Sequence, residues 1–179
     1  MKKVLKYILL FVVAVIAIVL IAGVFISRDF HFETSIVINA PKEKVWQNVG
    51  TLAGMDKWNP WNERDPNMQK SIQGQDGTVG AVSTWKGNKQ VGSGSQTIKK
   101  IDAPNSIETD LHFIEPFDSR AVAYVNLTDE QGGTKVVWGF DSRFPYPFNV
   151  LSKFMNMKED LGKDFNGGLA KLKKISENE

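Results

Sequence analysis

Side chains able to do acid–base or nucleophilic chemistry are few in this sequence of 179 residues. There is no cysteine, and the two histidines are His31 and His112. Residues 92–95 contain serines between glycines, but the spacing is wrong for a G-x-S-x-G nucleophile motif. His31 adjoins an apolar N-terminal segment, and His112 alternates onto the polar side of its expected strand. A Ser-His-Asp hydrolase is therefore not expected.

Metal and phosphate sites have little support either. Two distant histidines without cysteine form no recognisable ligand cluster. Gly74, Gly77 and Gly80 make a loose glycine repeat, but a strand pattern follows them, so they indicate a hairpin. We predict no metal and no cofactor.

Large apolar side chains are the more informative set. As candidates to line a ligand cavity we select Trp58, Trp61, Trp85, Phe113, Trp138, Phe140, Phe154 and Met155. Filling the core is the alternative role, and it is the one expected for Trp46 and Phe165. Trp58 and Trp61 flank Pro60 in an irregular stretch, where recognition residues are common and an indole offers apolar area with one donor. Both roles stay open for this pair.

A continuous apolar run occupies residues 7–26 and carries no charge. About 20 apolar residues match the ~30 Å hydrocarbon core of a bilayer. A cleaved secretory signal is the alternative, because Lys2, Lys3 and Lys6 precede the run. However, the run exceeds the roughly 7–15 residues of the hydrophobic region of a signal peptide, and no clear A-x-A site follows. We expect an uncleaved transmembrane anchor over residues 7–26, after a short cytoplasmic N-terminus of residues 1–6.

The charges predict an orientation and exclude one class of partner. Three lysines precede the span, whereas Arg28 beyond it stands beside Asp29, so the N-terminus is expected in the cytoplasm and the domain outside the cell membrane. Without those lysines, 19 basic residues face 20 acidic ones. Such a balance predicts no nucleic-acid surface.

Beyond a linker of residues 27–31, residues 32–179 have the size of one domain. Phe32, Ile36 and Ile38 share one face of a first strand. Asn39 and Pro41 favour the start of a short helix, and a second short helix is expected around Leu52. Residues 68–143 alternate between strand patterns and turn residues, which predicts a meander of six further strands.

The last segment has a helical period. Apolar residues recur at spacings of three, four or their multiples at Leu151, Phe154, Met155, Leu161, Phe165, Leu169 and Leu172. This pattern predicts a long amphipathic helix. Gly162, Gly167 and Gly168 weaken it by roughly 1 kcal/mol each relative to alanine, so we expect them to serve close approach or a bend. An antiparallel sheet needs one covered face, and this helix is the element able to cover it.

Several motifs together resemble the SRPBCC superfamily, and more narrowly its bacterial polyketide cyclase/dehydrase-like members. They are residues 36–41 with Glu43, Val45 and Trp46, then residues 57–61, 65–66, 84–88, 138–140 and 144–148. The resemblance implies the α+β helix-grip fold of START and birch-pollen-allergen proteins: a seven-stranded antiparallel sheet wrapped around a long C-terminal helix, with two short helices after the first strand. It also implies an apolar ligand held between sheet and helix.

The sequence therefore predicts a membrane-anchored binding module for a hydrophobic small molecule or lipid. Two alternatives remain open. One is a protein-interaction or stress-response domain with a vestigial cavity, and the other is a cyclase/dehydratase-type enzyme, which needs a polar residue inside the cavity. The sequence names neither the ligand nor a protein partner.

Overall fold

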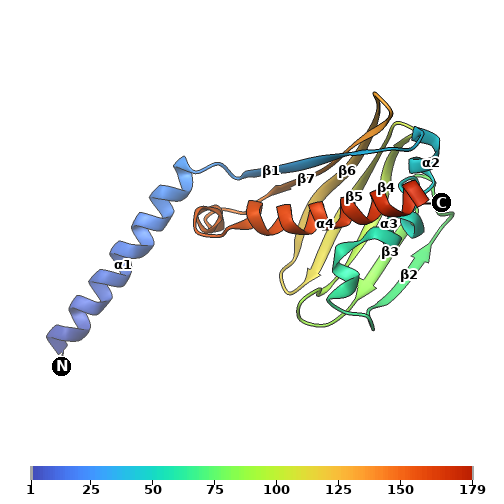
Figure 1. The fold of residues 1–179 in the computed structure, drawn as a ribbon. Helices are drawn as coiled ribbons and strands as arrows, with labels where there is room; N and C mark the ends of the chain where they lie inside the picture. Colours follow the sequence, from blue (N-terminus) through green and yellow to red (C-terminus); the bar gives the residue numbers. More distant parts are fainter. Residues whose placement is uncertain (1, 179) are drawn as a thin grey trace. The chain divides into compact units, whose positions relative to one another are not determined.

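The computed structural model describes residues 2–178. Its elements, labelled in Figure 1, are α1 (Lys2–Phe25), β1 (Asp29–Ile38), α2 (Lys42–Trp46), α3 (Leu52–Trp58), η1 (Pro60–Glu63), β2 (Gln69–Gln73), β3 (Val82–Lys86), β4 (Ser93–Asp102), β5 (Ser106–Glu115), β6 (Ser119–Glu130), β7 (Gly133–Arg143), η2 (Phe148–Lys153) and α4 (Met157–Asn178). The expected N-terminal segment begins at Met1 and the expected domain ends at Glu179, and these two residues lie outside the described part.

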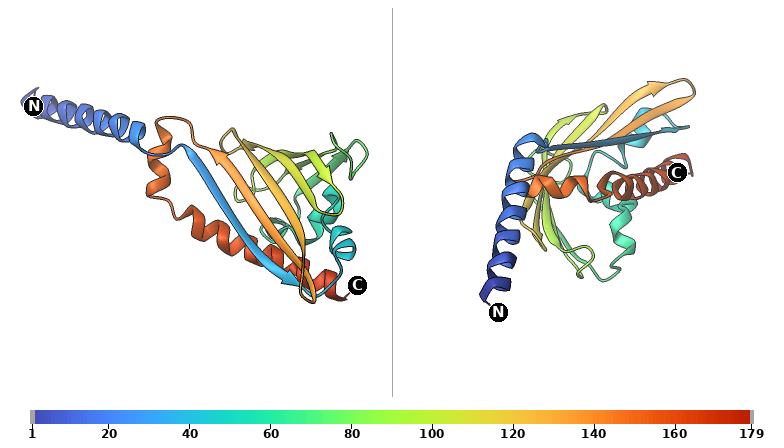
Figure 2. Two further views of the ribbon diagram at one scale, coloured as in Figure 1. Left: turned by 90° about the horizontal axis from the view of Figure 1, so that it is seen from above. Right: turned by 90° about the vertical axis from the view of Figure 1, so that its left-hand side faces the viewer.

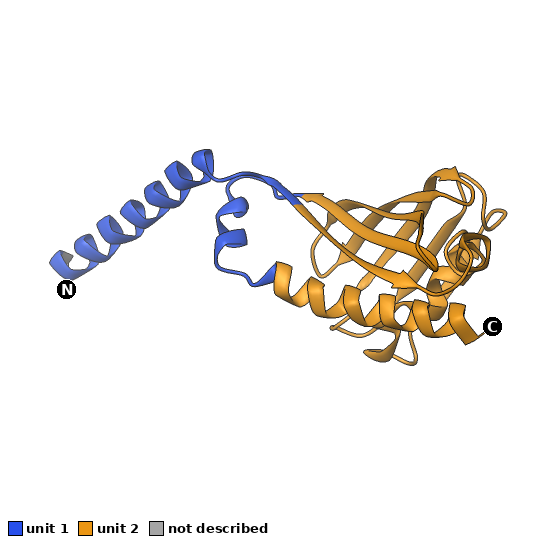
Figure 3. Ribbon diagram, turned by 45° about the horizontal axis from the view of Figure 1, so that its top comes forward, with its two compact units in different colours: residues 1–30, 143–157 blue, residues 31–142, 158–179 orange. Residues whose placement is uncertain are grey.

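The chain divides into two compact units (Figure 3). The first contains the residues up to 30 together with residues 143–157, and so joins α1 to the connection between β7 and α4. The second contains residues 31–142 and the residues from 158 onward, and so holds most of the sheet, α2, α3, η1 and α4.

The second unit is built on a seven-stranded sheet of order β1-β7-β6-β5-β4-β3-β2. Strands β2 to β7 form antiparallel neighbours in chain order, and β1 lies beside β7. Figures 1 and 2 show α4 running along one face of this sheet. The predicted α+β architecture is confirmed, with two short helices after β1, seven strands and a long C-terminal helix.

Alternation along the strands and the helical period of α4 direct apolar side chains to one core. Phe165, Leu169 and Leu172 of α4 are almost fully buried and belong to one cluster with Ile38 and Val136 of the sheet. Burying such side chains is worth about 1.5–3 kcal/mol each. The core therefore fixes α4 against the sheet.

A glycine allows α4 to approach the sheet closely. A Cβ on Gly168 would lie 2.8 Å from Cζ3 of Trp138 and 3.2 Å from Cδ of Pro60, whereas a Cβ on Gly167 would meet nothing within 4 Å. At Gly162 the nearest atom, in Phe32, would be 3.6 Å away, which is an ordinary contact. The expected close approach is confirmed at Gly168 alone.

Two predicted boundaries differ from the structure. Strand β1 begins at Asp29, within the segment expected to be a linker. Helix α4 begins at Met157, so Leu151 lies in the separate 3₁₀ helix η2 and Phe154 and Met155 lie in the connection that follows. In the second case the segment ahead of α4 is bonded through the Asn149 side chain to the end of α1, a contact that periodicity does not reveal.

Helix α1 matches the predicted apolar span. Residues 3–25 form a helix in which a stretch of 18 residues has a mean hydropathy of 3.4, and its side chains are almost all exposed. This helix is long and apolar enough to cross a membrane, although a signal sequence near an N-terminus meets the same description.

Candidate functional site

A cavity of about 400 Å³ lies within the second unit, and every residue that lines it belongs to that unit. Its walls come from strands β2 to β7 on one side and from α3, η1 and the first half of α4 on the other. The strands supply it with alternate residues, as at Ile107, Thr109, Leu111 and Phe113 of β5. This volume is in the range of small-molecule sites.

Six of the eight candidate residues selected from the sequence line this cavity: Trp58, Trp61, Trp85, Phe113, Trp138 and Phe140. Phe154 and Met155 do not line it. They lie in the other unit, and their side chains are 81% and 54% exposed. Their assignment to the cavity is corrected, because α4 starts after them and its apolar stripe does not include them.

One end of the cavity is a packed aromatic wall. The Trp138 ring stacks on Phe165 with centroids 3.8 Å apart, and Trp58 meets Trp138 edge-on at 4.8 Å. Trp61 contacts both Trp138 and Phe165 edge-on, at 6.0 and 6.3 Å. Such pairs add about 0.5–1.5 kcal/mol beyond their buried area. This wall is therefore rigid.

Within that wall, Trp58 and Trp61 have different surroundings. The Trp58 side chain is 2% exposed, and its indole N–H donates to the carbonyl oxygen of Asn48 at 2.8 Å. Trp61 is only partly buried, at the start of η1, where the Asn59 side chain accepts its backbone N–H. Trp58 therefore has a structural role in the wall, while Trp61 presents free ring surface to the cavity.

A second aromatic pair stands on the sheet. Trp85 of β3 and Phe113 of β5 contact edge to face with centroids 5.9 Å apart, and the Trp85 indole N–H donates to the carbonyl of Val91 at 3.3 Å. Beyond Phe113, the β5–β6 turn carries Phe117, which lines the cavity and is 79% exposed. The cavity therefore reaches the surface beside this turn.

Two polar side chains of the sheet face the interior. The Gln96 amide donates to the Thr109 hydroxyl at 3.0 Å, and that hydroxyl donates to the carbonyl of Ala123 at 3.3 Å. Sequence reasoning missed both residues. The signal was available, since Gln96 precedes Ile98 by two positions and Thr109 precedes Leu111 by two, which places each on the inward face.

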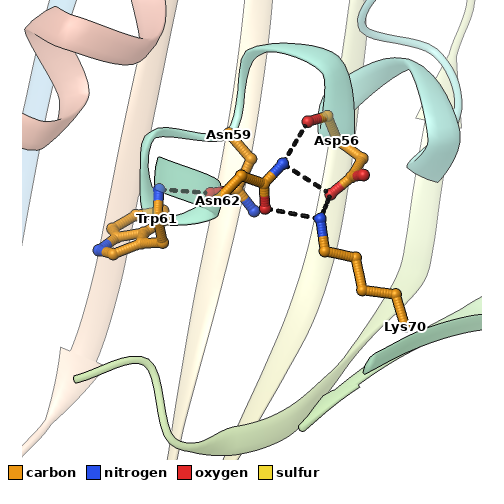
Figure 4. Close-up of polar contacts among 5 residues, drawn as sticks. All are labelled: Asp56, Asn59, Trp61, Asn62 and Lys70. Carbon is orange, nitrogen blue, oxygen red and sulfur yellow. Dashed lines mark hydrogen bonds and ion pairs between the residues drawn. The ribbon is translucent and has the colours of Figure 1, made fainter. Parts of the chain in front are cut away.

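A charged group lies at the rim on the helical side (Figure 4). The Lys70 ammonium donates to Asp56 Oδ1 at 2.7 Å and to Asn62 Oδ1 at 2.6 Å, and the Asn62 amide donates to the backbone oxygen of Asp56 at 2.8 Å. Asp56, Asn59 and Lys70 are among the lining residues. Nothing in the spacing of Asp56 and Lys70 pointed to this pair, because they come from α3 and β2 and meet only in the fold.

The histidines lie away from this cavity. His31 Nδ1 is 2.6 Å from Asp141 Oδ1, and His112 Nε2 is 3.2 Å from Asp118 Oδ2. Neither histidine lines the cavity within residues 2–178, and Asp141 also faces outward, as predicted. The ionisable lining residues are Asp56, Lys70, Glu115 and Tyr124, but the Tyr124 side chain alternates onto the outer face of the sheet, where Glu33 and Asp141 lie.

Tyr124 belongs to a polar group that includes Glu33. The phenol donates to Glu33 Oε2 at 2.8 Å. Burial, together with the hydrogen bond to the Glu33 carboxylate and its charge, raises the pKa of Tyr124 to about 12. The phenol is therefore a hydrogen-bond donor at neutral pH and a poor general base.

The curved sheet, the long helix and the apolar cavity between them define a helix-grip domain. Residues 29–177 match the protein family described as polyketide cyclase / dehydrase and lipid transport. Because this match includes most of the chain, the protein belongs to that family. No curated protein matches the chain.

Solved structures share the fold at low sequence identity. Ara h 8.0201 is 16% identical with a TM-score of 0.57, over 83% of this chain and 97% of that one. The Aha1 dimer from Colwellia psychrerythraea gives 17% and 0.58, again over 83% and 97%. The di-domain ARO/CYC BexL from the BE-7585A biosynthetic pathway gives 15% and 0.60, over 85% of this chain and 51% of that one. Likenesses at these identities establish the fold alone.

Proposed function

We propose that this protein is a membrane-anchored binding module that holds a hydrophobic small molecule or lipid in the cavity between sheet and α4. One observation carries the proposal: aromatic side chains line about 400 Å³ of space without filling it. Two aromatic groups line the cavity, and its charged lining residues Asp56, Lys70 and Glu115 are at least partly exposed. A ligand with an apolar body and a polar end fits this distribution.

Anchoring through α1 is the second part of the proposal. It is supported by the length and hydropathy of that helix and by the three lysines in its N-terminal turns. The domain would then lie on the extracytoplasmic side.

The binding proposal is tested by filling the cavity from the sheet. Leu111 and His112 are neighbours on β5 that face opposite sides, and only Leu111 lines the cavity. We expect the full-length chain, purified in detergent from its own membranes, to carry an apolar mass in native mass spectrometry. Leu111→Trp should lose that mass, and the matched variant His112→Trp should keep it.

Two results would count against binding. One is an equal apolar mass in Leu111→Trp. The other is a wild-type chain that carries no such mass and takes none up from a lipid extract. The second result would favour the protein-interaction function, for which partner capture is the next experiment.

An enzyme of the cyclase/dehydratase type is the second candidate. The observation that favours it is polar chemistry at the cavity, from Gln96 and Thr109 inside and the Asp56–Lys70 pair at the rim. A carboxylate beside an ammonium group is able to move a proton on a positioned substrate. Turnover of an extracted ligand that is abolished in Asp56→Asn, with binding retained, would establish this function.

A further inference from the structure

The connection between β7 and α4 is attached to the end of the apolar helix α1. Both belong to the first compact unit (Figure 3). The backbone N–H of Phe144 donates to the carbonyl of Arg28 at 2.8 Å, and the rings of Phe30 and Phe144 meet edge-on at 6.1 Å. The connection therefore starts directly beside the residues that follow α1.

Asn149 fixes the middle of this connection. Its amide nitrogen donates to the carbonyl oxygens of Gly23 and Ile26, both at 2.8 Å, and the side chain is fully buried. The last carbonyls of a helix lack partners within the helix, and an unpaired carbonyl is costly where water is scarce. Asn149 thus satisfies acceptors that a membrane-spanning helix must present at its end.

Tyr146 and Gly23 complete the attachment. The Tyr146 hydroxyl donates to the carbonyl of Leu20 at 3.0 Å. A Cβ on Gly23 would lie 3.0 Å from Cε2 of Tyr146 and 3.3 Å from Oδ1 of Asn149. A glycine at this position therefore allows the connection to lie directly against the helix.

The same connection exposes a concentrated apolar surface. Phe148, Leu151, Phe154 and Met155 have exposed fractions of 59%, 51%, 81% and 54%. A concentration of exposed large apolar side chains is unusual on a water-facing protein and marks a contact with a partner or a membrane. The end of α1 adds to it, since Phe25 is 84% exposed.

Charge and position select the membrane as the partner. Residues 142–158 include Arg143, Lys153 and Lys158 and no acidic residue, which suits anionic lipid headgroups. At 1.5 Å per residue the 24 residues of α1 extend about 36 Å, slightly more than a hydrocarbon core of ~30 Å. Groups bonded to residues 20–26 would then lie at the membrane surface, where aromatic residues and snorkelling lysines are favoured.

We propose that residues 146–155 are a membrane-interface docking element that inserts Phe148, Leu151, Phe154 and Met155 among the lipids at the outer end of α1. This inference rests on the proposed anchoring through α1. The element resembles an interfacial segment held in place by the transmembrane helix itself.

Site-directed spin labelling tests the proposal, and the absence of native cysteine makes single-cysteine variants simple to prepare. The full-length chain is reconstituted in vesicles of phosphatidylcholine and phosphatidylglycerol, with one nitroxide at Phe154→Cys. We expect this label to collide more often with oxygen than with a polar nickel complex. A label at Lys89→Cys, on an exposed turn of the other unit, should show the reverse.

A second nitroxide label within α1 distinguishes a failure of the docking proposal from a failure of the anchoring proposal. If Val13→Cys reports the hydrocarbon core while Phe154→Cys reports water, docking is overturned and anchoring stands. If Val13→Cys also reports water, the proposed anchoring fails as well. A Phe154→Cys label that is immobilised and shielded from both collision partners indicates a protein contact and overturns lipid docking.

The role of Asn149 is tested in the same samples. Asn149→Ala should shift the label at position 154 toward the nickel complex and leave a label at position 13 unchanged. Unchanged accessibility at position 154 would contradict the attachment through Asn149.

Discussion

At the scale of single residues, Trp58 and Trp61 of the cavity wall differ in their surroundings. The Trp58 indole N–H is buried and bonded to the protein backbone, whereas the Trp61 side chain is only partly buried and lines the cavity. We therefore propose a structural role for Trp58 and a ligand-recognition role for Trp61.

Replacing each tryptophan by phenylalanine separates these roles. Trp58→Phe removes the donor to the Asn48 carbonyl and leaves a buried acceptor unpaired, so we expect the free energy of unfolding to fall by about 1–3 kcal/mol. Trp61→Phe should change stability less and ligand retention more. Thermal unfolding and native mass spectrometry of the two full-length variants check this, and equal losses of stability would contradict it.

Tyr124 predicts a stability change at alkaline pH. Its pKa is about 12 in the folded chain and 10.0 for an ordinary tyrosine. Below pH 10 the phenol is protonated in both states, so its contribution to stability is constant. Between pH 10 and pH 12 the unfolded chain loses the proton first, which favours unfolding.

The matched variant is Tyr124→Phe. We expect the stability difference between wild type and this variant to be flat below pH 10 and to shift against the wild type up to pH 12. Chemical unfolding across this range measures the difference, and a flat difference throughout would rule out a raised pKa.

At the scale of elements, α4 packs closely against the Trp138 ring of the sheet at Gly168. Gly167 and Gly168 are adjacent in the helix interior, and an added methyl group meets open space at one and the Trp138 ring at the other. Helix propensity is the same for both positions, so any difference between them comes from packing.

Alanine at these two positions should therefore have opposite effects. Gly167→Ala should raise the free energy of unfolding by about 0.5–1 kcal/mol, through helix propensity alone. Gly168→Ala should lower it, because the ring of Trp138 and Pro60 must move. Urea unfolding followed by tryptophan fluorescence measures both, and stabilisation by Gly168→Ala would show that α4 is not tightly packed there.

At the scale of the whole molecule, the two proposed functions, membrane anchoring and ligand binding, belong to different units. The first contains the apolar helix and the exposed aromatic connection, and the second contains the cavity. The proposed anchoring assigns them to the membrane and to the extracytoplasmic space.

The orientation is open to a direct test. A single cysteine at Lys89 should react with a membrane-impermeant maleimide in intact cells, whereas a cysteine inserted ahead of Lys2 should react only after lysis. The positive-inside bias of the three lysines is the physical reason. Protection of the Lys89→Cys site in intact cells would place the domain in the cytoplasm.

The sequence by itself determined the order and type of the elements. Period-two alternation in residues 32–38 and 68–143 and the helical period from Leu161 to Leu172 report which side of each element meets an apolar neighbour, and that information is local. Eight large apolar side chains were selected as cavity candidates, with the fold supplied by family resemblance, and six of them line the cavity.

Only the tertiary structure decided what depends on contacts between distant segments. The Asp56–Lys70 pair joins α3 to β2, and Asn149 meets carbonyls more than 120 residues earlier in the chain. The residues around Asn149 form the separate helix η2 ahead of α4, and Phe154 and Met155 lie outside both α4 and the cavity. Periodicity records burial but not the partner that causes it, so an apolar stripe facing lipid and one facing the core look alike in sequence.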